Sequence, residues 1–206
     1  MAELAKTSEA VHRDYTGAKI GMWLFLFTEI LLFGGLFLVY AVYRTKHQAD
    51  FHTAAAELSV AIGAANTMIL LTSSLTMALA IAAIRRSAKT ASIVFQSLTI
   101  LFAVIFLVNK YFEWGAKIGH GLYPNSPELL AQSHGTILFY GLYYVMTGLH
   151  ALHVLIGIGL LLTMLILTVR DRITNTDFVK LENSGLYWHL VDIVWIYLFP
   201  LLYLIT

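Results

Sequence analysis

Several ionisable side chains of this sequence stand inside stretches that are otherwise apolar, where carboxylates and imidazoles can hold or pass protons. Glu29 lies near the middle of one stretch, and His150 and His153 lie near the middle of another. The two histidines are one helical turn apart and would share a helix face. A charged group at such a position costs about 2.5–3.5 kcal/mol, so it needs a partner. The pattern predicts a cluster of Glu29, His150 and His153, acting as a polar clamp between helices or as a proton-holding site.

A second pair with the same spacing, His189 and Asp192, lies at the start of the last apolar stretch, followed by Trp195. These two residues are expected either to bond each other or to contact another subunit. Asn66 and Ser73 lie on one stripe of an earlier stretch, where small and hydroxyl-bearing residues let helices approach and hydrogen-bond. We therefore assign Asn66, Ser73, His189, Asp192 and Trp195 to polar packing or subunit contact.

The histidines do not predict a haem or metal site. His150 and His153 lie one turn apart on one helix, so they cannot supply ligands to opposite faces of a haem, and His189 lies near an interface rather than at mid-depth. Glu29 alone offers too few further ligands for a metal. Cysteine is absent, which excludes disulfides, cysteine-ligated iron–sulfur clusters and thioether-linked haem. We expect no catalytic, cofactor or metal site on this chain.

The composition indicates a membrane protein. Of the 206 residues, 59% are hydrophobic and 12% are charged, against about 25% charged in soluble domains. A soluble fold of this size has too small an interior to bury so much apolar surface. The net charge of +1 gives no indication of nucleic-acid binding.

Five apolar stretches must position these side chains. Each reaches the roughly 20 residues that a helix needs to cross the hydrocarbon core, and none shows the alternation of a barrel strand. The sequence therefore predicts an all-α integral membrane bundle of five transmembrane helices. Within the stretches the charged residues are Glu29, Lys110, Glu113 and Asp192, of which Glu113 is expected at a hydrated interface. The predicted spans are 20–43, 58–84, 91–114, 136–169 and 184–205.

The distribution of basic residues predicts the orientation of the bundle. Residues 1–19 form a tail of mixed charge, unlike the basic start of a signal peptide, and 20–206 form a single transmembrane domain. Nine Lys and Arg residues fall on the side of the tail and four on the other. Since cytoplasmic loops are rich in Lys and Arg, we predict that the N-terminus lies in the cytoplasm and the C-terminus outside.

Four segments resemble motifs of subunit III of the haem-copper terminal oxidases, the cytochrome c oxidase subunit 3 family. The segment around Glu29 resembles that family's third helix and reads GMWLFLFTEILLFGGLFLVY. The other three read ANTMILLTSS, TGLHALHVLIG and YWHLVDIVWIYLF, and all four occur in the family's order from about residue 18 to 203. The chain resembles the five-helix bacterial form, without the first two helices that complete a phospholipid cleft in seven-helix members.

The resemblance implies a non-redox accessory subunit of a haem-copper oxygen reductase in the bacterial cytoplasmic membrane. A larger catalytic subunit would carry the haem and copper, reduce oxygen to water and pump protons. This chain would support its assembly, its stability during turnover and its proton uptake. Other oxidase subunits and membrane lipid are implied partners. A bound phospholipid is a further expectation, if another subunit replaces the missing helices.

Two alternatives stay open at this point. The electron donor would bind elsewhere, so an accessory subunit of a quinol oxidase or of a nitric oxide reductase is an alternative to the cytochrome c oxidase-like subunit. A function of another class is an independent proton or ion transporter that uses Glu29 and the histidines. The sequence shows neither the inverted repeat nor the paired broken helices that are typical of transporters.

Overall fold

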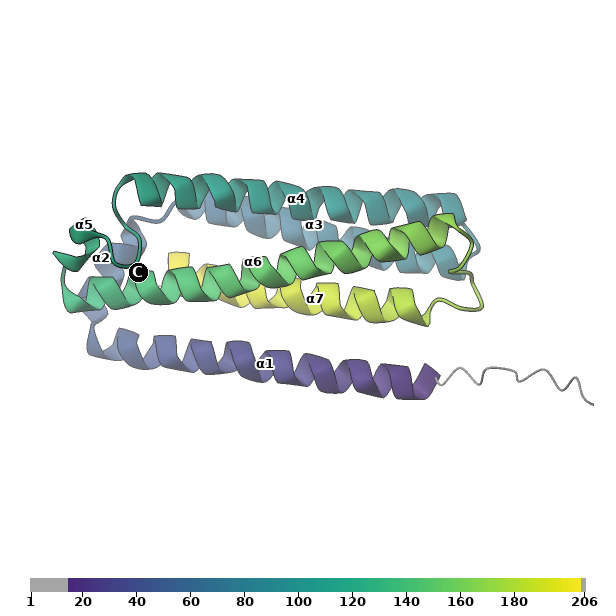
Figure 1. Ribbon diagram of the computed structural model, residues 1–206, viewed down its shortest axis with the longest axis horizontal. Helices are drawn as coiled ribbons and strands as arrows, with labels where there is room; N and C mark the ends of the chain where they lie inside the picture. The colour runs from purple at the N-terminus through teal and green to yellow at the C-terminus, as the bar shows by residue number, and fades with distance from the viewer. Residues whose placement is uncertain (1–14, 205–206) are drawn as a thin grey trace, which may run out of the picture.

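A computed structural model describes residues 15–204 of the chain, so most of the predicted tail lies outside the described residues. Five long helices run side by side, and Figure 1 shows them as one elongated bundle. Their bounds are α1 (Tyr15–Lys46), α3 (Val60–Arg85), α4 (Lys89–Gly119), α6 (His134–Val169) and α7 (Val179–Phe199).

The prediction of an all-α bundle with five membrane-spanning helices is confirmed. Each long helix, α7 together with the turn that follows it, is long and apolar enough to cross a membrane. Most of the helices extend beyond the predicted spans: α4 continues to Gly119 and α7 begins at Val179, whereas α3 begins two residues after its predicted start. Their outer turns carry polar and charged residues, so hydropathy marks only the part of each helix that matches the hydrocarbon core.

Helices α3, α4, α6 and α7 form the packed centre, and α3 with α4 is its most extensive contact. Helix α1 packs against α6 and α7 on the side away from α4 (Figure 1). Its buried residues Leu26, Phe33 and Tyr40 are seven positions apart and therefore form one narrow stripe. Most of the remaining α1 surface faces outward, as expected for a helix that borders lipid or another protein.

Two of the connections between the predicted spans contain short helices. Helix α2 (Gln48–Ala56) follows α1, and α5 (Pro127–Leu130) precedes α6, at the end of the bundle where the chain finishes (Figure 1). Phe51 of α2 packs edge-on against the rings of Tyr40 and Phe139, with centroids 5.3 and 5.5 Å apart. These apolar contacts stabilise α2, which is too short to be recognised as a membrane-spanning helix from its hydropathy.

Close approach of α6 and α7 depends on a small residue. A Cβ atom at Gly157 would lie 2.7 Å from the Trp188 ring, so a larger residue would push the helices apart. Helix α7 then ends at Pro200, which has no backbone N–H to donate. The chain continues as one π-helical turn, η1 (Pro200–Leu204), which buries Tyr203.

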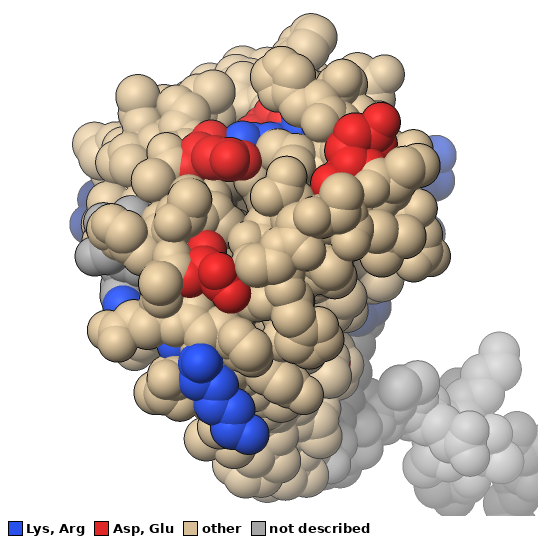
Figure 2. Space-filling view, turned by 90° about the vertical axis from the view of Figure 1, so that its left-hand side faces the viewer, with Lys and Arg blue, Asp and Glu red and all other residues tan. Residues whose placement is uncertain are grey.

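The described members of the larger set of basic residues lie at one end of the bundle, and the other two members, Lys6 and Arg13, lie outside the described residues. Figure 2 shows the end formed by α2 and α5, where acidic patches and basic side chains are interspersed. The opposite end holds the α3–α4 and α6–α7 connections and the start of α1. Basic residues at that opposite end, within the described part of the chain, are Lys19, Arg85, Arg86, Lys89, Arg170, Arg172 and Lys180.

Candidate functional site

Glu29 and His153 form a hydrogen bond that joins α1 to α6, with 2.8 Å between Glu29 Oε2 and His153 Nε2. His153 Nδ1 lies 2.8 Å from the carbonyl oxygen of Leu149, which can only accept, so Nδ1 carries a hydrogen. A neutral imidazole then presents Nε2 as an acceptor to a protonated Glu29, whereas a charged imidazolium donates to a carboxylate. In either state the two side chains share one proton.

The surroundings of this pair are apolar. The side chains of Glu29 and His153 are only 14% and 11% exposed. The Phe33 ring meets the imidazole edge-on at 5.2 Å, and the Tyr187 hydroxyl donates to the His153 carbonyl at 3.1 Å. Because a low local dielectric strengthens a hydrogen bond and penalises an unpaired polar group, removal of either partner is costly.

The structure does not bring His150 to Glu29. Its ring is fully buried and lies 5.4 Å from the Phe106 ring and 5.3 Å from the Trp195 ring. Neither ring nitrogen has a hydrogen-bond partner among residues 15–204. Two residues three positions apart point about 60° away from each other around a helix. His153 therefore reaches α1, whereas His150 faces α4 and α7.

Asn66 and Ser73 lie on the buried face of α3 and bond neighbouring helices. Asn66 Oδ1 accepts from Asn109 Nδ2 of α4 at 2.9 Å. Ser73 Oγ accepts from Trp188 Nε1 of α7, also at 2.9 Å. Both α3 residues are fully buried, so these bonds pair groups that would otherwise be unsatisfied in an apolar interior.

On α7, Trp195 and His189 also bond hydroxyl groups of α3. Trp195 Nε1 donates to Thr67 Oγ1 at 3.1 Å, and His189 Nδ1 lies 2.6 Å from Ser74 Oγ. The expectation that His189 bonds Asp192 is wrong, because His189 bonds Ser74 of α3 instead. Asp192 is 2% exposed and Trp195 is fully buried, which favours packing within the chain over contact with another subunit.

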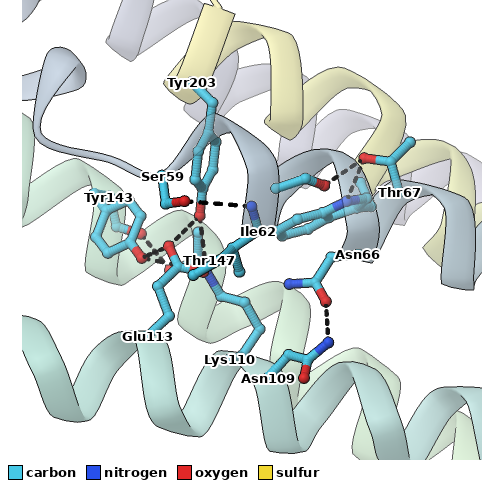
Figure 3. A network of polar contacts seen from close by, with 12 residues as sticks. Ser59, Ile62, Asn66, Thr67, Asn109, Lys110, Glu113, Tyr143, Thr147 and Tyr203 are labelled. Atoms are coloured by element: carbon cyan, nitrogen blue, oxygen red, sulfur yellow. Dashed lines mark hydrogen bonds and ion pairs between the residues drawn. The ribbon is translucent and has the colours of Figure 1, made fainter.

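A buried ion pair that the sequence analysis missed joins Lys110 and Glu113 of α4, with 3.1 Å between Lys110 Nζ and Glu113 Oε2 (Figure 3). The hydroxyls of Tyr143 and Tyr203 both donate to Glu113 Oε1, the former at 2.7 Å. The hydroxyl oxygens of Tyr143 and Tyr203 also accept hydrogen bonds from Lys110 Nζ, at 3.2 and 3.0 Å. The Trp195 ring lies 5.3 Å from the ammonium and completes an aromatic wall around it.

The expectation of a hydrated Glu113 is therefore wrong, because its carboxylate is enclosed by Lys110, Tyr143 and Tyr203. Glu113 is 6% exposed and forms part of the lining of a pocket of about 380 Å³ at the α2 and α5 end. The spacing of Lys110 and Glu113, opposite charges one turn apart in an apolar stretch, is the signal that could have indicated a pair. Their tyrosine partners come from α6 and η1, far away in the sequence, and no local pattern marks them.

Comparison with known proteins identifies the family of this chain. Residues 4–206 match the family profile of cytochrome c oxidase subunit III. Cytochrome c oxidase subunit 3 of Thermostichus vulcanus is 32% identical over 196 residues, which cover 95% of this chain and 90% of that protein. The chain belongs to the cytochrome c oxidase subunit III family. Subunit III proteins are accessory subunits of haem-copper oxidases, so this chain is a multi-pass membrane protein of such a complex.

The subunit III relatives come from oxidases with different donors and different chain organisation. Cytochrome bo(3) ubiquinol oxidase subunit 3 of Pseudomonas aeruginosa is 27% identical, covering 98% of this chain and 91% of that protein. Heme-copper oxidase subunit I+III of Aeropyrum pernix is 31% identical and covers 91% of this chain. The match takes up 22% of that longer protein. A subunit III segment can thus form part of one chain with subunit I.

Within residues 15–204, no group of three or more His, Cys, Asp or Glu side chains is placed to hold a metal ion. Glu29 with His153 is a two-residue set that is already hydrogen-bonded. The hydrogen bond between Glu29 and His153 supports the sharing of a proton and the attachment of α1 to α6.

Proposed function

We propose that this subunit III binds the haem- and copper-bearing catalytic subunit of an oxygen reductase and stabilises that subunit during turnover, without a redox centre of its own. The match over nearly the whole chain supports the proposal. The single observation that carries the partner assignment is the Aeropyrum pernix protein, named subunit I+III. In that chain the matching segment is tied to subunit I, which favours direct contact between the two parts here.

Within this role, the hydrogen bond between Glu29 and His153 is a polar clamp that holds α1 against α6. Helix α1 has one narrow buried stripe, so a bond at mid-length contributes a large share of its attachment. The shared proton also suits a part in proton uptake, which is the sharper alternative. The two roles predict different effects of the substitution Glu29→Gln.

The relatives support both a cytochrome c oxidase and a quinol oxidase as the parent complex. The donor would bind another subunit in either case, so the proposed role of this chain is the same. A lone proton transporter remains the functional alternative of another class, and it would be isolated without haem-bearing partners.

A lipid chain is a further proposed ligand. A groove of about 240 Å³ between α1 and α7 is bordered by apolar side chains, including Phe33, Phe37 and Val194, and by Gly34. An acyl chain matches that lining in chemistry. Other subunits of the complex would close the outer side of the groove.

We place the subunit in a bacterial cytoplasmic membrane with the N-terminus inside. The chain has no cysteine, so single cysteines can be mapped without background. We expect Arg86→Cys to react with an impermeant thiol reagent only after the cells are opened. Gln132→Cys, at the opposite end, should react in intact cells. The reverse pattern would contradict the orientation.

Deletion of the gene tests the proposed function. We expect oxidase lacking this chain to assemble in lower yield and to lose activity faster during continuous turnover, because α1 to α7 no longer support the catalytic subunit. The measurement is oxygen consumption against time by equal amounts of haem from both strains. Equal yield and equal decay would contradict the proposal.

A further inference from the structure

Within residues 15–204, Asp192 is a buried acid without a counter-charge. Neither carboxyl oxygen has a hydrogen-bond partner of good geometry among the described residues, and the residue is 2% exposed. Ser74 of α3 is close enough to Asp192 to influence its carboxyl group, without forming a hydrogen bond of good geometry. A carboxylate left without a partner in an apolar interior is strongly disfavoured, while the protonated acid needs only one acceptor.

The polar side chains of the neighbouring helices are engaged with other partners or lie between aromatic rings. On α6, His153 bonds Glu29 of α1, and His150 sits between aromatic rings. On α3 and α7 the facing polar groups are Ser74 and His189, which bond each other at 2.6 Å. Because Asp192 is buried within the chain, a neighbouring subunit has no access to it either.

A route from Asp192 to the surface runs through the hydrogen bond between Ser74 and His189. His189 belongs to the wall of a pocket of about 400 Å³ that also contains Lys19, Arg85 and Glu182. The side chains of Lys19 and Arg85 are 50% and 58% exposed and pair with Glu182, so the pocket opens at the end where α1 begins. Because His189 Nδ1 is bonded to Ser74, Nε2 is the ring nitrogen left to exchange protons with water in the pocket that His189 lines.

We propose that Asp192 is a proton-binding site that fills from the α1-start end of the bundle through His189 and Ser74. His189 Nε2 takes a proton from water in the pocket, and Nδ1 passes its own proton to Ser74 Oγ. Ser74 in turn passes its hydroxyl proton to Asp192. One proton enters and one carboxyl becomes neutral, with His189 left as the other tautomer. This inference rests on the proposed function only for the use that the complex makes of the proton.

Infrared spectroscopy of the purified oxidase complex tests the site without any need for turnover. A protonated carboxyl absorbs apart from the amide bands and shifts when its hydrogen is replaced by deuterium. We expect one such band to disappear in Asp192→Asn and to remain in Glu29→Gln, the matched change at the other intramembrane acid. In His189→Phe the band should persist, but its exchange in deuterium oxide should slow roughly 10²-fold.

Two results would overturn the inference. One is a carboxyl spectrum that is unchanged by Asp192→Asn, which would mean that Asp192 is ionised. The other is unchanged exchange in His189→Phe, which would mean that protons arrive by another route. If Asp192→Asn fails to assemble, Ser74→Ala provides the test. Loss of the Ser74 hydroxyl, the acceptor for the protonated carboxyl, must shift the Asp192 band. An unshifted band refutes the site. Loss of this band together with normal sustained activity would leave the proton site intact and count against its use in turnover.

Discussion

Replacement of Lys110 by Met should destabilise this subunit by about 3–5 kcal/mol, because it leaves the carboxylate of Glu113 buried without its counter-ion. The Lys110 and Glu113 side chains are 3% and 4% exposed, so little water reaches Glu113 to replace the lost ammonium. The two tyrosine hydroxyls alone must then stabilise the charge. Unfolding in detergent against increasing dodecyl sulfate, followed by circular dichroism, measures the loss.

The double variant separates the cost of an unpaired charge from the loss of packing. Lys110→Met with Glu113→Gln removes both charges and keeps an oxygen that accepts from Tyr143 and Tyr203. Since a buried ion pair adds little net stability over neutral groups of similar volume, the double variant should recover most of the loss. Lys46→Met, an exposed lysine, is the matched control and should change stability by less than about 0.5 kcal/mol. A double variant as unstable as Lys110→Met would contradict this account.

Removal of the Glu29 side chain should loosen α1. Glu29→Ala leaves His153 Nε2 without its partner, and hydrogen bonds between membrane helices contribute about 0.6–1.7 kcal/mol. We expect less of this subunit to remain with the oxidase after detergent washing. The adjacent Thr28→Val is the matched control, because Thr28 is exposed and bonds only a carbonyl of its own helix, Phe25.

Glu29→Gln distinguishes the clamp from the proton-holding role. The amide of glutamine can donate to His153 Nε2, so it preserves the bond, but it cannot exchange a proton. We expect Glu29→Gln to assemble and to sustain turnover normally, as a clamp requires. Normal assembly with faster loss of activity would instead support proton holding. Normal assembly and normal sustained activity in Glu29→Ala would contradict both roles.

The parts of the fold that were predictable are those with a local signal. Membrane-length apolar stretches marked all five long helices, and the depth of Glu29 and His153 in their stretches pointed to their contact. Helix α2 was missed because it is stabilised by contacts of Phe51 with rings distant in the sequence, Tyr40 and Phe139. A short helix of this kind has no period or hydropathy that separates it from a loop.

The polar groups that were missed depend on helix rotation and on distant partners. His150 and His153 are equivalent in depth, and only the packed direction of α6 decides that His153 meets Glu29. Lys110 and Glu113 carried a local signal in their spacing, but Tyr143 and Tyr203 complete the site only after α6 and η1 are in place. Likewise, the bond of His189 to Ser74, and with it the isolation of Asp192, follows from how α7 packs on α3.

The most direct test is affinity purification of this chain from its native membrane in a mild detergent, with haem and copper measured per chain. We predict that a larger subunit with haem and copper copurifies, and that oxidase activity follows the tag. The chain separated afterwards from its partners should show no Soret absorption. Recovery of the chain as a lone homo-oligomer, or a stoichiometric Soret band on the separated chain, would contradict an accessory, non-redox subunit III.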